Sequence, residues 1–125
     1  MIRVSQYHTG ASSSCAIAFY NQSLQIKESI NDVGGKATTL NNMADLKAQQ
    51  GDIEGAIALY NQSLQINDSI NNVGGKAGTL HQIAYLKAQQ GDTEGAIAFY
   101  NQSLQIKESI NDVGGKATTL NNMAL

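Results

Sequence analysis

The apolar residues in the middle of the chain recur at the spacing of a helix. From Ile53 onward they fall at steps of three, four and six residues, with Asn and Gln side chains between them. The stripe consists of Ile53, Ala56, Ile57, Tyr60, Leu64 and Ile70. This spacing is typical of an amphipathic helix that buries one face and leaves the other in water. Residues 53–70 are therefore predicted to form a helix.

The segment before this helix has a second amphipathic pattern. Its apolar positions are Val33, Ala37, Leu40, Met43, Ala44 and Leu46. Residues 33–50 are therefore also predicted to be helical. Between the two helices, Gly51 can take the left-handed conformation that ends a helix, and Asp52 can accept the first free amides of the next one. Because this turn is tight, the two helices are expected to form an antiparallel hairpin.

The connection from Ile70 to Gly75 contains the next start signal. It has amide side chains suited to an N-cap and two glycines where backbone freedom or a close helix approach is needed. It is predicted to end one helix and begin the next. No useful stretch alternates with period two, and β-branched residues are scattered rather than grouped. The predicted fold class is therefore all-α.

The hairpin pattern returns at a fixed offset along the chain. Residues Ala16–Ala44 and Ala96–Ala124 share the same 29 letters at a displacement of 80, and a related copy, Ala56–Ala84, lies halfway between them. A period of 40 is typical of a solenoid, in which each unit buries its apolar face against the next. We predict a divergent segment over 1–12 and an α-solenoid over 13–125, with helices over 13–30, 33–50, 53–70, 73–90, 93–110 and 113–125.

Composition restricts the partners that this surface can bind. The chain has 125 residues, of which 14% are charged, and a formal net charge of -2, whereas it contains 12 Asn and 12 Gln residues. It lacks the basic stripe that phosphate backbones require and the polybasic patch that binds an anionic membrane. It also has neither a long apolar run nor a signal peptide at residues 1–10. We expect no nucleic-acid or membrane partner and a cytoplasmic location.

The sequence contains no motif that predicts catalysis. His8 and His81 stand without a Cys or carboxylate at metal-ligand spacing, and Cys15 has no base within local reach. The Gly-Gly-Lys run that ends at Lys36 lacks the following Ser or Thr and the preceding strand of a phosphate-binding loop. We therefore expect no enzymatic activity, no cofactor and no metal.

The segment 37–66 resembles a tetratricopeptide repeat. The pattern of that family combines small residues at helix crossings with a Gly-Asp turn at a fixed offset. The matching residues are Leu40, Met43, Ala44, Gly51, Asp52, Ala56, Tyr60, Ser63 and Leu64, and the pattern recurs from Leu80 to Leu104. The sequence departs from the family pattern at Lys47 and Lys87, where an aromatic residue is usual.

The period of 40 is longer than the usual period of about 34 residues. The chain resembles a forty-residue variant found in adaptor proteins that bind regulators of cell polarity, in which an Asn-Asp-x-x-Gly run precedes the first helix of each hairpin. Here that run is Asn31, Asp32 and Gly35. The resemblance implies a right-handed superhelix whose first helices line a concave groove that holds a peptide.

The resemblance also implies which side chains face the groove. They are Asn41, Asn42, Asp45, His81, Gln82, Tyr85, Asn121 and Asn122. Amides suit this role because each offers a donor and an acceptor to a peptide bond. His81 and Tyr85 could stack on a ligand side chain. The alternative is that all these residues are solvated positions of amphipathic helices.

The cationic clamp with which some family members hold a C-terminal carboxylate is missing. Thr38 and Gly78 are among the residues that occupy its positions. Lys36, Lys76 and Lys116 lie one turn earlier, where we expect a solvated edge.

Two functions are consistent with this sequence. The first is a scaffold that binds a protein or peptide in the groove. The second is self-association into a homo-oligomer, in which the last helix of one molecule packs on the first helix of another or exchanges with it. The residues expected in that contact are Ile17, Tyr20, Leu24, Val113, Ala117, Leu120 and Met123. A third interpretation is that the chain is a piece of a longer array whose neighbours cover both ends.

Overall fold

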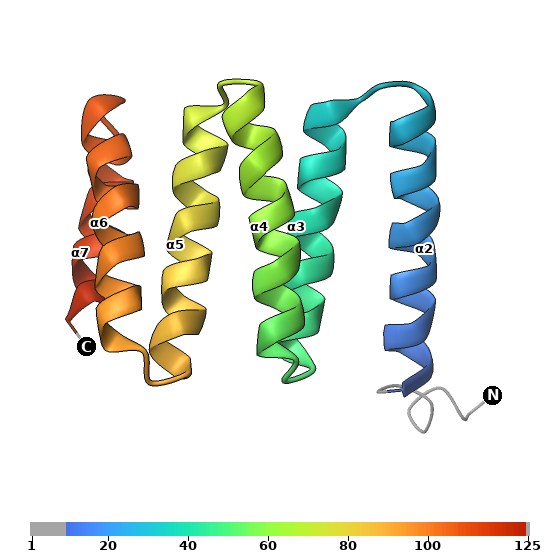
Figure 1. Cartoon of the computed structure of the whole chain (residues 1–125), viewed down its shortest axis with the longest axis horizontal. Coiled ribbons are helices and arrows are strands. Elements are labelled where there is room, and N and C mark those ends of the chain that lie inside the picture. The colour runs from blue at the N-terminus through green and yellow to red at the C-terminus, as the bar shows by residue number, and fades with distance from the viewer. Residues whose placement is uncertain (1–9, 125) are drawn as a thin grey trace.

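The computed structural model describes the backbone of residues 10–124 and the side chains of residues 15–124. Within that range the chain forms six helices and no strand, as the sequence predicts (Figure 1). The helices are α2 (Gly10–Ser29), α3 (Val33–Gln49), α4 (Ile53–Ser69), α5 (Val73–Gln89), α6 (Thr93–Ser109) and α7 (Val113–Met123). The first helix begins at Gly10, earlier than the predicted residue 13. Residues 1–9 of the predicted divergent segment, and Leu125, lie outside the described residues.

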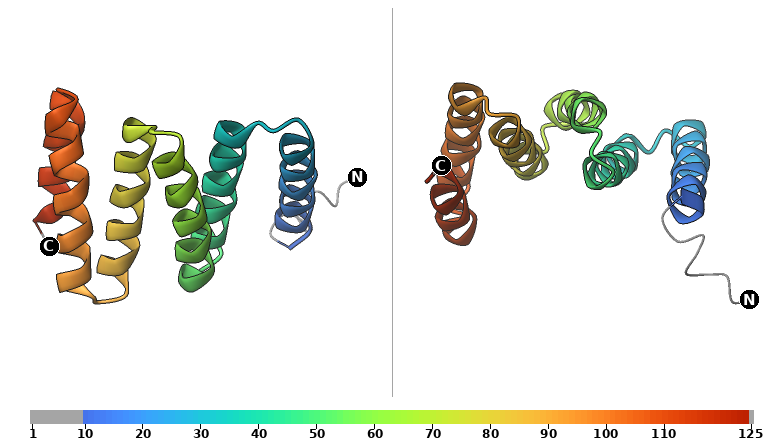
Figure 2. Two further views of the ribbon diagram at one scale, coloured as in Figure 1. Left: turned by 45° about the horizontal axis from the view of Figure 1, so that its top comes forward. Right: turned by 90° about the horizontal axis from the view of Figure 1, so that it is seen from below.

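The helices follow one another from α2 to α7 in a row that zigzags, with α3 partly behind α4 and α7 behind α6 in Figure 1, and each runs antiparallel to the next (Figure 1 and Figure 2). The most extensive pairings are those of α3 with α4 and of α5 with α6, which are the two predicted hairpins. Seen end-on, the row is curved, because the two end helices, α2 and α7, are displaced toward the same side. We call this the inner side of the row, and α3 lies nearer to it than α4 (Figure 2). The arrangement confirms the predicted α-solenoid.

Local capping explains where the helices begin. The side chain of Asp52 accepts a hydrogen bond of 2.9 Å from the amide of Gly55, and Asn72 accepts one of 3.0 Å from the amide of Gly75. Asp32, Asp92 and Asp112 make the same bond at their helices. Each cap satisfies an amide that the first helical turn leaves free.

The two kinds of turn use different residues to reverse the chain. Gly51 and Gly91 have φ values of 87° and 84°, as predicted for the turn inside each hairpin. Between hairpins the left-handed residue is an asparagine, Asn71 with φ 58°, and not one of the predicted glycines. Gly75 instead permits a close approach, because a β-carbon there would lie 2.6 Å from Asn72 Nδ2. A β-carbon at Gly75 would also lie 3.0 Å from Asn67 Oδ1 of α4, so the predicted close helix approach applies at Gly75, whereas Gly74 has no neighbour closer than 3.9 Å.

Small residues allow the helices of a hairpin to approach closely. Ala44, Ala56, Tyr60, Ile83 and Leu86 form one buried cluster across α3, α4 and α5. A second cluster contains Ala84, Ala96 and Tyr100. Packed alanines permit short distances between helix axes, and the tyrosines fill the space between them.

The buried face of α4 differs from the predicted stripe. Beyond Tyr60 it continues through Ser63 and Asn67, whereas Leu64 is half-buried and Ile70 is exposed. Ser63 Oγ donates to the carbonyl oxygen of Ala37 over 3.2 Å, so this position faces backbone at a distance that suits a small hydroxyl. Ser103 makes the equivalent bond to Ala77 over 2.8 Å. Val33 of the other predicted stripe is also exposed.

Candidate functional site

A hollow of about 280 Å³ lies between α3, α4 and α5. It is lined by Asn41, Asp45, Tyr60, Gly75, Gly78, Thr79 and Gln82. The fold therefore brings together Asn41, Asp45 and Gln82, three of the residues predicted to face the groove. We call this hollow the α3–α5 hollow.

Tyr60 holds the carboxylate of the α3–α5 hollow in place. Its hydroxyl donates a hydrogen bond to Asp45 Oδ1. Burial, followed by this hydrogen bond and the carboxylate charge, raises the pKa of Tyr60 far above its ordinary value of 10.0. Tyr60 is therefore a donor at any physiological pH, and it orients Asp45 while the Asp45 side chain stays exposed.

Two buried polar atoms of the same hollow have no hydrogen-bond partner among the described residues. They are Asn41 Oδ1 and Thr79 Oγ1. Thr79 is only 2% exposed. Buried polar groups in folded proteins are nearly always paired, so each of these atoms calls for an explanation.

The junction 40 residues later carries different side chains at the equivalent sequence positions. His81, Tyr85 and Tyr100 stand there in the places of Asn41, Asp45 and Tyr60. His81 Nδ1 lies 3.2 Å from Thr119 Oγ1, and His81 Nε2 lies 2.9 Å from Asn122 Nδ2. Because Asn122 Nδ2 can only donate, Nε2 accepts from it and Nδ1 carries the proton that points to Thr119. Both ring nitrogens of His81 therefore bond to α7.

The imidazole of His81 is half-buried. It meets the Tyr100 ring edge-on, with 5.3 Å between the ring centres and an angle of 75°. Burial, and then the charge of Lys107, lowers the pKa of His81 below its ordinary value. His81 is thus a neutral contact between α5 and α7, and its stacking on a ligand stays a prediction.

The remaining groove candidates lie in two kinds of place. Tyr85, 48% exposed, and Asn122, half-buried, line a second hollow of about 230 Å³ with Tyr100. We call it the α5–α7 hollow. Asn42 and Asn121 are exposed on α3 and α7 and line neither hollow.

Successive hairpins are joined by a lysine that the sequence analysis missed. Lys107 Nζ donates a hydrogen bond of 2.9 Å to Thr119 Oγ1, and Lys27 Nζ donates one of 2.8 Å to Thr39 Oγ1. At the middle junction Asn67 replaces the lysine, and Thr79 Oγ1 is left without a partner. The sequence did contain a signal for this contact. Lys27 and Asp32 of one repeat are both replaced by asparagine, Asn67 and Asn72, in the next repeat, and such a joint loss of opposite charges indicates that the two positions interact.

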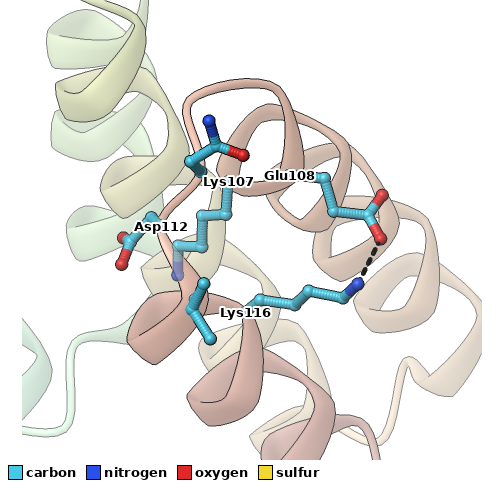
Figure 3. Close-up of a pocket in the computed structure, with 6 residues that line it drawn as sticks. Lys107, Glu108, Asp112 and Lys116 are labelled. Carbon is cyan, nitrogen blue, oxygen red and sulfur yellow. Dashed lines mark ion pairs between the residues drawn. The ribbon is translucent and has the colours of Figure 1, made fainter.

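A separate hollow of about 220 Å³ lies at the loop between α6 and α7 (Figure 3). Lys116 reaches across it to Glu108 with a nitrogen–oxygen distance of 2.9 Å. Lys36 and Lys76 form the equivalent pairs with Glu28 and Asp68, at 2.8 and 2.9 Å. These lysines, predicted to lie on a solvated edge, are partly exposed and neutralised by acids of the preceding helix.

The residues expected in self-association lie at the two ends of the row. On α2, Ile17, Tyr20 and Leu24 are half-buried. On α7, Val113, Ala117 and Leu120 are exposed and Met123 is half-buried. Leu120 is 49% exposed, whereas Leu40, at the identical position of α3, is 2% exposed under α4. α2 and α7 lie at opposite ends of one molecule, so these two sets do not meet within it (Figure 1).

These features define an α-solenoid of repeated helical hairpins, held together by small buried residues and carrying polar hollows between repeats. Profiles of the tetratricopeptide repeat match residues 16–69 and residues 77–110. The chain belongs to the tetratricopeptide repeat family. Comparison with curated proteins found no match.

Repeats of this family generally mediate protein–protein interaction, and the family is typically a non-catalytic scaffold. Among the described residues, no helix is long and apolar enough to cross a membrane. The same part of the chain contains no cluster of three or more His, Cys, Asp or Glu side chains that could hold a metal ion.

Proposed function

We propose that this chain is a scaffold that binds an extended segment of a partner protein along the inner side of the curved row and catalyses no reaction itself. The observation that carries the proposal is the pair of hollows at equivalent positions of successive repeats. In this proposal the extended segment passes both hollows and places side chains in them.

The chemistry of the inner side supports a peptide over other ligands. Gln82 and Asn122 occupy equivalent positions at the two hollows, and each offers a donor and an acceptor to a main-chain amide. Tyr85 adds an exposed aromatic face to the α5–α7 hollow. The formal net charge of -2 favours a protein segment over nucleic acid or an anionic membrane surface.

The proposal is tested by titrating the isotope-labelled chain with a pool of unstructured peptides and recording amide signals by NMR. Binding in the two hollows shifts the signals of Asn41, Gln82 and Tyr85. The amides of Gln62 and Gln102, exposed on α4 and α6, serve as the control. Shifts confined to these control residues, or the absence of saturable shifts with every peptide, would contradict the proposal.

A second candidate function is self-association through α2 and α7. It is supported by the contrast between Leu120 and Leu40, which lie at the same position of two segments with the same sequence. Leu40 is buried, whereas Leu120 is exposed and could be buried by a second molecule. Burial of an apolar side chain contributes about 1.5 to 3 kcal/mol, and association costs about 4 to 15 kcal/mol. Light scattering over a concentration series tests this candidate: growth in mass that Leu120→Gln abolishes supports it, and a constant monomer mass excludes it.

A further inference from the structure

The carboxylate of Asp45 has no ion-pair partner among the described residues, as is also true of Asp32, Glu54, Glu94 and Asp112. The carboxylates of Glu28, Asp68 and Glu108 each pair with a lysine at 2.8 or 2.9 Å. Tyr60 fixes one oxygen of Asp45, and the Asp45 side chain stays exposed at the α3–α5 hollow. Asp45 is therefore an oriented acceptor with capacity for another donor.

The other polar atoms of this hollow also need donors. Asn41 Oδ1 is an acceptor by chemistry, and the hydroxyl of Thr79 can accept as well as donate. Neither atom has a partner within the described part of the chain. Because Asn41 Oδ1 has no donor to lose, turning its carbonyl toward the hollow breaks no hydrogen bond at that oxygen. A group that offers several donors and no acceptor would complement all three residues.

The chain itself shows which group satisfies a threonine at this position. At the two flanking junctions, Thr39 and Thr119 accept hydrogen bonds from the ammonium groups of Lys27 and Lys107. At the middle junction Asn67 occupies the position of this lysine, and its amide nitrogen donates to Ser63 Oγ instead. The middle threonine, Thr79, therefore lacks the ammonium that its counterparts have.

The neighbouring α5–α7 hollow lacks these properties. Tyr85 stands in the place of Asp45 and removes the carboxylate, and His81 stands in the place of Asn41 with both nitrogens bonded to α7. The α3–α5 hollow thus has hydrogen-bond acceptors without donors, whereas the ring nitrogens of His81 beside the α5–α7 hollow are already hydrogen-bonded. The difference predicts selectivity between the two hollows.

We infer that the α3–α5 hollow binds the cationic head of a lysine or arginine side chain of the partner segment. The inference rests on the proposed function, since it specifies a side chain of the bound peptide. Asp45 supplies the charge, and Asn41 and Gln82 accept further hydrogen bonds from the ammonium or guanidinium group. The net charge of -2 also favours the approach of a basic segment.

The test compares three short peptides that differ at one central residue: lysine, norleucine and glutamate. Each is titrated into the isotope-labelled 125-residue chain, and the signals of Asn41, Gln82 and Thr79 are followed by NMR. We expect saturable shifts with the lysine peptide and binding weaker by about tenfold or more with norleucine, because a charge-assisted hydrogen bond is lost. The Asp45→Asn variant should lose the preference for lysine, and the matched control Glu94→Gln, which removes an exposed acid of α6, should keep it.

The double variant Asn41→His with Asp45→Tyr places the residues of the α5–α7 hollow in the α3–α5 hollow. It should also lose the lysine preference while its circular dichroism spectrum stays helical. Equal shifts with the lysine and norleucine peptides, or an unchanged preference in Asp45→Asn, would overturn the inference. If those peptides bind equally well along both hollows, the proposed peptide-binding function stands and only the cation site is wrong.

Discussion

Lys107 and Thr119 join two successive hairpins through a hydrogen bond of 2.9 Å between the ammonium nitrogen and Oγ1. Lys107 is 8% exposed, and burial lowers its pKa while the charge of Asp112 opposes that shift. The lysine, the threonine and the capping aspartate thus act as a unit. Residue Asn67 breaks the unit at the middle junction, where Asn72 also replaces the aspartate.

The double variant Asn67→Lys with Asn72→Asp should strengthen the middle junction. It gives Thr79 the donor that Thr39 and Thr119 already have, and a satisfied hydrogen bond adds about 1 kcal/mol to the free energy of unfolding. Urea unfolding followed by circular dichroism measures the gain. Asn67→Lys alone should gain less, because the buried ammonium then lacks its carboxylate. A double variant less stable than the parent would show that the lysine cannot fit there.

Two equivalent threonines should respond differently to loss of the hydroxyl. Thr119→Val removes the partner of Lys107 and of His81, and should destabilise the fold by about 1 to 3 kcal/mol. Thr79→Val removes a buried hydroxyl that has no partner among the described residues, and should leave the stability unchanged within about 0.5 kcal/mol or raise it. Thermal and urea unfolding of both variants provide the comparison. Equal losses would contradict this account of the two junctions.

His81 should make the stability depend on pH. Its pKa is lowered from 6.5 in the folded protein, so the unfolded chain binds the proton more tightly. The contribution of neutral His81 is therefore fully present above about pH 6.5, begins to fall as the pH drops through that value, and is lost below the folded-state pKa. Urea unfolding at about pH 7.5 and about pH 5.5 should show this loss, and His81→Asn, which copies Asn41, should reduce it.

The periodic sequence predicted the helices and hairpin turns because their causes are local. Asp52 caps the helix that begins one residue later, and Gly51 supplies the left-handed turn beside it. The sequence could not predict the environment of His81, because its partners Thr119 and Asn122 lie 38 and 41 residues away on another helix. That contact exists only after the repeats have stacked.

The buried face of the second helix in each hairpin was also misjudged. Apolar spacing favoured Leu64 and Ile70, whereas the structure buries Ser63 and Asn67. A serine can be buried there because its small hydroxyl donates to a carbonyl oxygen of the adjacent helix and lets the two helices lie close together. A prediction from apolar spacing alone does not include such a hydrogen bond. Of the predicted groove residues, Asn41, Asp45 and Gln82 line one hollow, and their binding of a peptide stays a prediction.

Two glycines should differ in what an added methyl group does. Gly78 lies inside α5 with nothing within 4 Å of its β-carbon position, so Gly78→Ala should stabilise the fold by about 0.5 to 1 kcal/mol. Gly91 has φ 84°, so Gly91→Ala should destabilise it by about 1 to 2 kcal/mol. Thermal unfolding of each variant checks the pair. A stabilising Gly91→Ala would contradict the left-handed turn.

The most direct test of the central claim is the location of a bound peptide on the curved row. Intermolecular NMR contacts between an isotope-labelled chain and an unlabelled bound peptide provide that location. We expect contacts with the side chains of Asn41, Gln82 and Tyr85, which line the α3–α5 and α5–α7 hollows. Contacts made instead with the exposed residues of α4 and α6, such as Gln62 and Gln102, would contradict it.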